Sequence, residues 1–553
     1  MIHSTLSIRR FALSICLAVS LAAGAKAQDR GVALTGTVAS AEEGAMEGVL
    51  VSAQRAGAPI TVTVVSDAQG RYRFPADRLA AGAYTLAIRA AGYELGAAAT
   101  AEVAADRTAT ADLNLRKASD LAAQLTSTEW LNSMPGTAEQ KLPLIECMSC
   151  HTLERVLRSK FTADEFVGVL RRMQGYANNT TTQHPQLRVA EREMSEKRAR
   201  DLADYVASLN LSGGRETWAF PLQALPRPRG RATHVIITEY ALPRPTIAPH
   251  DVRPDRDGIV WYSNFVEPFI GRLDPKTGAH AEFRYPLPKP KFPEGALALE
   301  PDQDGNWWLS MMFQSGLTRF DPRTKEFRHH PIPPEQMTDG TQQSLMMPGR
   351  AKVDGKVWTN DVSTHEILRL DLATGAYERI NPFRNMPKGR QHSPYGMAAD
   401  AQNNLYFMDF GDESIGRVDA KTLRTTLYPT PTPRSRPRRG MMDDKGHLWF
   451  AEFAANKVGM FDPATEGFKE WAVPTPHTYP YDVYFDRQGE LWSGSMSSDR
   501  VLRLDPATGE SIEYLLPHQT NIRRIFIDDA KTPATLWAGN NHHASIVKVE
   551  PLD

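Results

Sequence analysis

Residues 443–462 read Asp-Asp-Lys-Gly-His-Leu-Trp-Phe-Ala-Glu-Phe-Ala-Ala-Asn-Lys-Val-Gly-Met-Phe-Asp, and this unit recurs through the C-terminal part of the chain. An aromatic residue heads every copy, at Trp261, Trp308, Trp358, Tyr406, Trp449, Trp492 and Trp537. An aliphatic residue follows nine positions later, and an acid stands four positions beyond it. Intervals of 43 to 50 residues are typical of four-stranded propeller blades. We therefore predict a seven-bladed β-propeller over residues 232–553.

The ends of this repeat indicate how the ring closes. The seventh copy stops at Glu550-Pro-Leu-Asp553 without an outer strand. A strand of the matching kind, Ile237-Thr-Glu-Tyr-Ala-Leu-Pro243, precedes the first copy and is similar to Glu513-Tyr-Leu-Leu-Pro517. Because a closed ring leaves no unpaired sheet edge, we predict that this early strand completes the seventh blade.

The first 27 residues have the pattern of an export signal. Arg9 and Arg10 precede an apolar run at 11–23, and Ala25-Lys-Ala27 offers a small-x-small cleavage site. A membrane anchor is the alternative interpretation. We expect a cleaved Sec-type signal peptide, a periplasmic or secreted protein, and no transmembrane segment in the mature chain. Charge is balanced, with 64 Lys and Arg against 65 Asp and Glu, so we expect no nucleic-acid partner.

Residues 28–117 alternate between apolar and polar positions in short runs, which predicts an antiparallel β-sandwich. The stretches Ser66-Asp-Ala-Gln-Gly-Arg-Tyr-Arg-Phe74 and Ala91-Gly-Tyr93 resemble the carboxypeptidase regulatory-like domain. The resemblance implies an immunoglobulin-like accessory module without catalytic residues.

The pentapeptide Cys147-Met-Ser-Cys-His151 holds the only cysteines that follow the predicted signal. Its spacing is typical of covalent c-type haem attachment, in which two thiols form thioethers with the haem vinyl groups and the histidine ligates the iron. A dithiol redox pair is the alternative, but it favours a βαβ context, and a structural zinc site needs more cysteines. We predict one covalent haem c bound by Cys147 and Cys150, with His151 as an axial ligand.

The sequence around this motif has a helical period. Thr162 and Glu165 form a capping-box pattern, and Ser195 precedes a run with apolar residues on one face. We predict a small all-α cytochrome c domain at 118–211, followed by a linker at 212–231. The expected fold class is therefore a multidomain chain with a sandwich, an all-α haem domain and a propeller.

The sixth ligand of the iron is open on the sequence alone. Thr162-Ala-Asp-Glu-Phe166, followed by Arg172-Met173, resembles short exported cytochrome c domains and favours Met173. Met194 is the alternative, His184 is a third candidate, and a purely structural role in the core accounts for either methionine equally simply.

Polar residues recur where the propeller strands approach the central channel. Acids stand three positions after the blade aromatic at Asp361, Asp409 and Glu452. Because neighbouring carboxylates repel one another, we predict a divalent cation or a basic group among them. A second ring precedes the first strand of several blades, at His250, Glu294, Tyr395, Arg439, Tyr481 and Arg523. Candidates for a propeller-mouth site are His250, Glu294, Asp361, Asp409 and Glu452; solvated acids paired with arginines are the alternative.

The blade text from Asp443 to Glu452, followed by Lys457-Val-Gly and Asp462-Pro-Ala-Thr, resembles virginiamycin B (streptogramin) lyase. The resemblance implies a seven-bladed propeller and a metal-assisted elimination that uses a histidine base and metal-binding glutamates. Glu452 matches a blade glutamate of that family. The sixth blade lacks a companion Glu-x-His, and His542 and His543 in the seventh blade are the nearest substitute.

These features predict haem-mediated electron transfer coupled to binding or conversion of a small-molecule substrate at the propeller mouth. The expected partner is a redox protein or a quinone-linked chain. Two alternatives remain: a propeller that only binds or senses, and a metal-dependent C–O lyase with an attached cytochrome. The enzyme class, between oxidoreductase and lyase, and the catalytic residues are left open.

Overall fold

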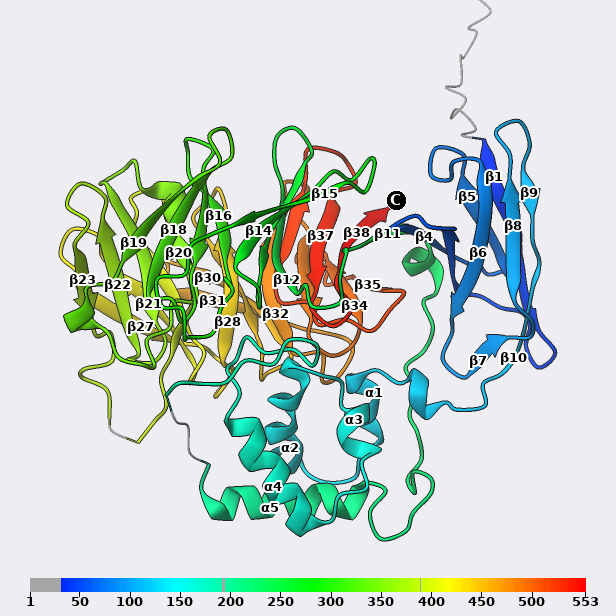
Figure 1. The fold of residues 1–553 in the computed structure, drawn as a ribbon, viewed down its shortest axis with the longest axis horizontal. Helices are drawn as coiled ribbons and strands as arrows, with labels where there is room; N and C mark the ends of the chain where they lie inside the picture. The colour runs from blue at the N-terminus through cyan, green and yellow to red at the C-terminus, as the bar shows by residue number, and fades with distance from the viewer. Residues whose placement is uncertain (1–30, 191–193, 388) are drawn as a thin grey trace, which may run out of the picture.

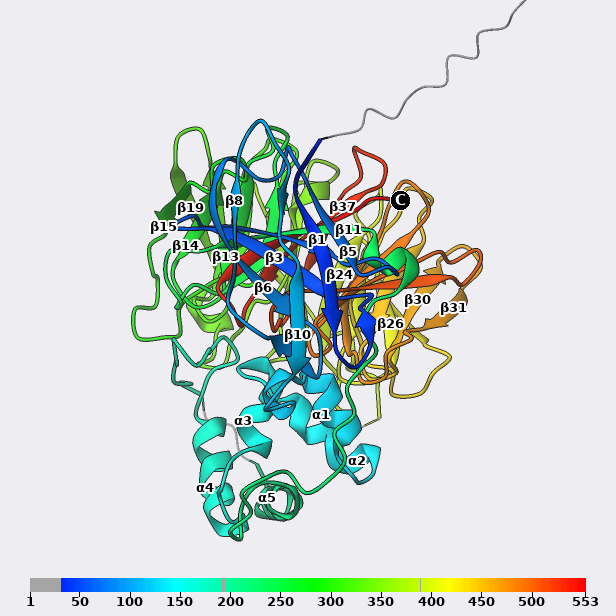
Figure 2. The same ribbon diagram turned by 90° about the vertical axis from the view of Figure 1, so that its right-hand side faces the viewer.

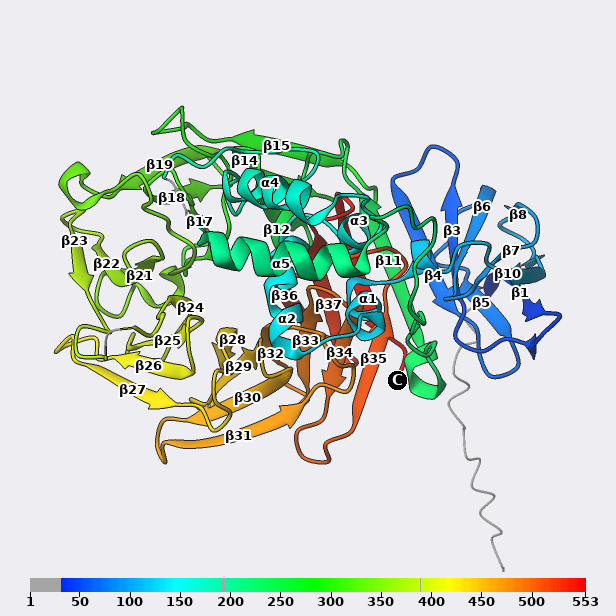
Figure 3. The ribbon, with the colours of Figure 1, turned by 90° about the horizontal axis from the view of Figure 1, so that it is seen from below.

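The computed structural model describes residues 31–190, 194–387 and 389–553, so the predicted signal at 1–27 lies outside the described residues. Sheets arranged around a common centre make up the C-terminal part, with the N-terminal β domain on one side and helices below (Figure 1). The view from below shows the blades as a ring behind the helices (Figure 3).

Six blades are meanders of four antiparallel strands. Blades one and two contain β12 (Pro249–Pro254), β13 (Val260–Asn264), β14 (Phe269–Leu273), β15 (His280–Arg284), β16 (Leu299–Pro301), β17 (Trp307–Ser310), β18 (Gly316–Asp321) and β19 (Glu326–Pro331). Blades three and four contain β20 (Met346–Met347), β21 (Lys356–Asp361), β22 (Glu366–Asp371), β23 (Tyr377–Ile380), β24 (Pro394–Ala399), β25 (Leu405–Asp409), β26 (Ser414–Val418) and β27 (Thr425–Pro429). Blades five and six contain β28 (Pro437–Met442), β29 (Leu448–Glu452), β30 (Lys457–Asp462), β31 (Gly467–Ala472), β32 (Pro480–Phe485), β33 (Leu491–Ser495), β34 (Arg500–Leu504) and β35 (Ser511–Leu515).

The seventh blade joins the two ends of the propeller. It contains β36 (Ile525–Asp528), β37 (Thr535–Asn540) and β38 (Ser545–Pro551), and its outer strand is β11 (Val235–Ala241). β11 runs antiparallel to β38, with Val235 opposite Pro551 and Ala241 opposite Ser545. The predicted closure of the ring by the early strand is confirmed.

The N-terminal β domain shares a sheet with this last blade. Its strands are β1 (Val32–Ser40), β2 (Gly44–Ala45), β3 (Leu50–Arg55), β4 (Ile60–Val65), β5 (Arg71–Pro75), β6 (Gly82–Arg89), β7 (Tyr93–Leu95), β8 (Ala99–Val103), β9 (Ala109–Thr110) and β10 (Leu113–Lys117). The free edge of β11 pairs with β4, so one eight-stranded sheet runs β36-β37-β38-β11-β4-β3-β6-β8 (Figure 2). The other strands of the domain form a six-stranded sheet.

The helices are short and lie below the propeller. They are α1 (Ser127–Ser133), α2 (Ala138–Lys141), α3 (Glu154–Leu157), α4 (Ala163–Gln174) and α5 (Glu196–Leu209), with 3₁₀ turns at η1 (Ala122–Gln124), η2 (Leu142–Ile145), η3 (Cys147–Ser149), η4 (Gly230–Thr233), η5 (Pro334–Gln336) and η6 (Pro348–Arg350). The predicted capping box of Thr162 and Glu165 opens α4, and Ser195 caps α5. Within the described residues, no helix is long and apolar enough to cross a membrane.

The prediction of a small all-α cytochrome c domain is wrong. The helices do not enclose a core of their own, because Trp130, Met148 and Leu202 share one apolar cluster with propeller residues Phe453, Tyr479, Tyr481, Tyr395 and Met496. In Figure 3, α5 lies across the lower face of the ring. A hydrophobic period reveals that a helix has an apolar face, but it does not say whether other helices or a sheet cover that face. The chain is mostly β-sheet, and the helical segment completes its core on the propeller.

The structure explains why the Asp-x-x-Gly-x-x-Trp sequence motif recurs. In the sixth blade, the indole N–H of Trp492 donates to the Asp486 carboxylate over 2.7 Å, and that carboxylate also accepts the Glu490 backbone N–H. The same indole-to-aspartate bond occurs at Trp261, Trp308 and Trp449. The acid thus closes the turn and fixes the aromatic ring between blades.

We expect Trp492→Phe to lower the free energy of unfolding more than Trp358→Phe does. Both side chains are fully buried, but the Trp492 indole donates to a carboxylate, whereas the Trp358 indole donates to the neutral carbonyl of Asn403. Losing a hydrogen bond to a charged group costs about 1.5–3 kcal/mol, against about 0.5–1.5 kcal/mol for a neutral one. Urea denaturation of both variants measures the difference; equal losses would contradict this account.

Candidate functional site

The predicted haem motif forms one tight turn. The Cys147 carbonyl accepts hydrogen bonds from the backbone N–H groups of both Cys150 and His151, each over 3.3 Å. Both thiols are free and half-buried. The turn therefore brings two thiols and an imidazole into a single five-residue unit, which is the donor set that the haem motif requires.

The chemistry of this unit differs from that of a redox dithiol. Burial raises the pKa of Cys147 to about 12, and burial also raises the pKa of Cys150. Catalytic dithiols instead need a lowered thiol pKa, because the thiolate is the nucleophile. Thiols that stay protonated in an apolar setting fit these values better.

His151 is oriented as an iron ligand would be. Its Nδ1 lies 3.0 Å from the Thr152 carbonyl, so Nδ1 is the protonated donor and Nε2 keeps its lone pair. Histidines that bind metals commonly donate their other ring N–H to a backbone carbonyl in this way, which fixes the tautomer. Burial lowers the pKa of His151, which favours the neutral ring.

A pocket of about 460 Å³ lies beside the motif. Helical-segment residues and propeller residues form its wall together: Cys150, His151, Thr152, Glu154, Arg155, Arg158, Thr182, Gln183, Gln519 and His542. Its size is within the range of small-molecule and cofactor sites. One cysteine of the motif and its histidine therefore face the same space as two propeller residues.

Side chains from five blades meet at the lower end of the channel, and we call them the mouth cluster: His250, Asp251, Tyr395, Arg439, Tyr481 and Arg523. Arg439 pairs with Asp251 at 3.2 Å, and Asp251 also accepts from His250 Nδ1 at 2.8 Å. The hydroxyls of Tyr395 and Tyr481 lie 2.5 Å apart. The ring predicted to precede the first strands therefore converges, apart from Glu294.

The mouth cluster and the haem motif are joined directly. Arg523 donates to the Ser149 carbonyl over 2.5 Å, and Asn521 donates to the Met148 carbonyl over 2.8 Å. The Met148 side chain is fully buried in the apolar cluster that contains Tyr395 and Tyr481. The structure thus brings two regions that we had predicted separately into one site.

Electrostatics at the mouth are dominated by arginines. Burial acts to raise the pKa of Tyr481, but the guanidinium groups of Arg438, Arg439 and Arg523 outweigh it and bring that pKa below its usual value. Burial lowers the pKa of His250 to about 3, so this ring is neutral. The mouth cluster therefore favours negative charge next to the Cys147–His151 turn.

The acids that we predicted to form a ring at the channel mainly accept hydrogen bonds from backbone N–H groups in turns of their own blades. Asp361 accepts from the backbone N–H of Gln342 and Ser363, and Asp409 accepts from those of Ser393 and Gly411. The equivalent residues of three other blades bind their own turns likewise, namely Asn264, Ser495 and Asn540. These side chains point into their own blades and are not gathered in one cluster at the channel.

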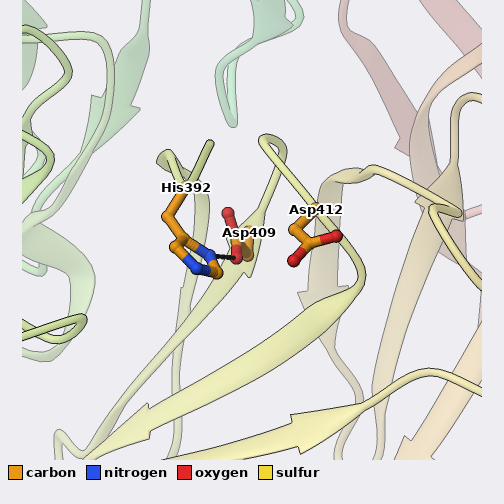
Figure 4. Close-up of side chains that lie close together, drawn as sticks. All are labelled: His392, Asp409 and Asp412. Carbon is orange, nitrogen blue, oxygen red and sulfur yellow. Dashed lines mark hydrogen bonds and ion pairs between the residues drawn. The ribbon is translucent and has the colours of Figure 1, made fainter. Parts of the chain in front are cut away.

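Asp409 does belong to a group with metal-ligand chemistry. His392, Asp409 and Asp412 offer ligand atoms within 4.8 Å of one another, and Figure 4 shows the His392 ring directed at Asp409. His392 Nδ1 lies 2.6 Å from Asp409, while Arg390 pairs with Asp412 at 2.8 Å. Each carboxylate thus has a basic partner already, which explains the cluster without a cation.

Glu452 and Glu294 have different surroundings. The Glu452 carboxylate is fully buried in blade five, where burial and the nearby Glu470 raise its pKa to about 8. Glu294 uses its backbone: its N–H donates to Gln186 and its carbonyl accepts from Asn179 and Gln186. Glu294 therefore anchors the 179–186 loop on the propeller.

The candidates for the sixth ligand lie apart from the pocket wall. Met173, on α4, is 37% exposed. Met194 is partly buried and packs on the apolar cluster that Cys147 also touches. His184 lies near Glu267 of the first blade. The choice among them stays a prediction.

Sequence reasoning missed the role of Met148 and the importance of Arg438, and it named His542 only as a substitute for the missing Glu-x-His pattern. Arg438 lies 3.7 Å above the Tyr481 ring. The sequence did not point to Met148, because any residue type can occupy that position of the Cys-x-x-Cys-His motif. The sequence does hold a signal for Arg438, because two arginines follow each other at 438–439. They stand at the start of a blade strand, where two adjacent solvent-exposed arginines are unusual.

Comparisons with known proteins cover the two β regions. Residues 33–116 match the carboxypeptidase regulatory-like domain, and residues 385–552 match the virginiamycin B lyase family. No curated protein matches the chain. Similar solved structures include virginiamycin B lyase from Staphylococcus aureus (20% identity, TM-score 0.49, 57% of this chain and 99% of that one) and a streptogramin B lyase (22%, 0.49, 58% and 99%). Another is the extracellular domain of a one component system from B. thetaiotaomicron (13%, 0.43, 55% and 40%).

Proposed function

We propose that this chain is an exported electron-transfer protein in which Cys147 and Cys150 bind one haem c covalently and His151 ligates its iron. When bound, haem supplies one-electron redox chemistry. The observation that carries the proposal is the convergence of the Cys-x-x-Cys-His turn, its correctly bonded histidine and a pocket whose wall the helical segment and the propeller share.

The propeller's own residues would hold this cofactor in place. Arg523 and Asn521 clamp the carbonyls of the turn, and buried Met148 locks the turn into the apolar cluster. Rigid support of this kind would reduce the structural rearrangement of the site when the charge of the haem iron changes. The virginiamycin B lyase-like blades thus act as a scaffold in this proposal.

A redox protein or a quinone-linked chain would exchange electrons on the open side of the pocket. Arg155 and Arg158 line the pocket and are exposed, so this rim meets solvent. Exposed cations at such a rim steer an acidic partner surface toward it. Export to the periplasm or the cell exterior is part of the same proposal, because it follows from the predicted signal.

The test is the purified mature protein from a host that attaches c-type haem. We expect a polypeptide that is heavier by one haem in denaturing mass spectrometry, with a c-type pyridine haemochrome spectrum. Cys147→Ala combined with Cys150→Ala should reduce covalent haem from one per chain to none. Ser149→Ala, inside the same turn, is the matched control and should retain it.

A colourless mature protein with the mass of the bare polypeptide and two thiols that react with a thiol reagent would refute the proposal. Loss of haem in the Ser149→Ala control as well would also count against it, because the effect would then reflect a damaged turn.

A further inference from the structure

The hairpin between β37 and β38 carries polar side chains that lack partners. Both ring nitrogens of His542, both amide atoms of Asn541 and the Ser545 hydroxyl are buried, and none makes a hydrogen bond within the described structure. Buried polar groups in native proteins are almost always satisfied. Five orphan atoms on one hairpin therefore point to a group that binds there.

The hairpin is held rigidly on its blade. Asn540 accepts from the His542 backbone N–H over 3.1 Å, and the Asn540 amide donates to the Gln519 carbonyl over 2.9 Å. This arrangement fixes the backbone on which His542 sits. The orphan nitrogens therefore stand on a fixed backbone and not on a loose loop.

His542 faces the haem motif. It lines the same pocket as Cys150 and His151, and the Met148 carbonyl and His151 both lie close enough to influence its pKa. No other histidine besides these two lines that pocket among the described residues. The Cys147–His151 turn and the β37–β38 hairpin therefore each place one imidazole in the wall of the same pocket.

We propose that His542, supplied by the propeller, is the second axial ligand of the haem iron, opposite His151. The inference rests on the proposed function and deepens it. A neutral imidazole with a free lone pair is the form that binds iron.

The two methionines fit this role less well. Neither Met173 nor Met194 lines the pocket, and Met173 is 37% exposed on α4. Histidine in place of methionine lowers the reduction potential of a haem, because Met/His ligation is the combination that raises it. The inference thus also predicts a lower potential than a methionine-ligated haem would show.

The test is the visible, near-infrared and electron paramagnetic resonance spectra of the full-length holoprotein. We expect a low-spin ferric haem without a methionine-to-iron charge-transfer band. His542→Ala should make the ferric haem high-spin and let the ferrous haem bind carbon monoxide, with covalent haem retained by mass. Free imidazole added to His542→Ala should restore the low-spin spectrum, and an unchanged far-ultraviolet circular dichroism spectrum shows that the variant is folded.

His543→Ala is the matched control, because its side chain is exposed and adjacent, and it should leave the spectra unchanged. Met173→Ala and Met194→Ala should also leave them unchanged. An unaltered low-spin spectrum in His542→Ala, or a change to high-spin in either methionine variant, would overturn the inference while the haem assignment stands. Absence of haem from the wild-type protein would instead refute the proposed function.

Discussion

Arg439→Met is expected to lower the free energy of unfolding by about 3–5 kcal/mol. Arg439 is 1% exposed and Asp251 is 2% exposed, and their ion pair spans blades one and five across the channel. Methionine keeps much of the side-chain volume but leaves the buried Asp251 carboxylate without its direct ion-pair partner. The other nearby cation, Arg524, is already paired with Glu300 and Asp482. An uncompensated buried charge is among the largest single destabilising effects known for point substitutions.

A double-mutant cycle provides the control. Arg439→Met combined with Asp251→Asn removes both charges, and we expect it to recover most of the loss, since replacing a buried pair by neutral groups is often close to neutral. Urea midpoints and slopes of the four proteins measure the coupling. A double variant as unstable as Arg439→Met alone would show that the pair does not hold the ring together.

Glu452→Gln is expected to flatten the pH dependence of stability and to stabilise the protein at alkaline pH. The folded-state pKa of Glu452, about 8, lies above the usual value of 4.5. Between these values the unfolded chain has released a proton that the folded chain retains, so stability falls as pH rises through this window. The total fall from one carboxyl is on the order of 5 kcal/mol.

Unfolding free energies between pH 4 and pH 9 measure this effect. Glutamine mimics the protonated acid, so the variant should lack the decline and exceed the wild type above pH 8. Glu466→Gln, an exposed acid of the same blade, is the control and should follow the wild-type curve. A Glu452→Gln variant that loses stability at pH 9 would mean that the ionised carboxylate has an unrecognised favourable partner.

The propeller could be predicted because its signals are local. An aspartate six residues before a tryptophan makes a bond within one hairpin, as Asp486 and Trp492 do, and four blades share this spacing. The closing strand could also be predicted, because its sequence resembles that of other outer strands. Hydrogen bonds made within one blade, and outer strands that resemble one another from blade to blade, can be recognised from the sequence.

The helical segment and the mouth could be predicted only in part, because their partners are distant. The caps of α4 and α5 are local and were predicted, but the apolar faces of the helices meet Tyr481 and other propeller residues. In the same way, the position of Asp361 in the repeat predicts a side chain that faces the channel. Its carboxylate instead accepts hydrogen bonds from two backbone N–H groups of its own blade. The sequence alone does not show where a side chain finds its partner.

The sheet that runs from β8 through β11 to β36 has a consequence for the order of assembly. β11 pairs with β4 on one edge and with β38 on the other, and β38 ends two residues before the C-terminus. During synthesis residues 32–241 emerge before β38, so the N-terminal domain can present β11 as a preformed template. β38 then docks onto β11, so the ring closes only after the seventh blade has been made.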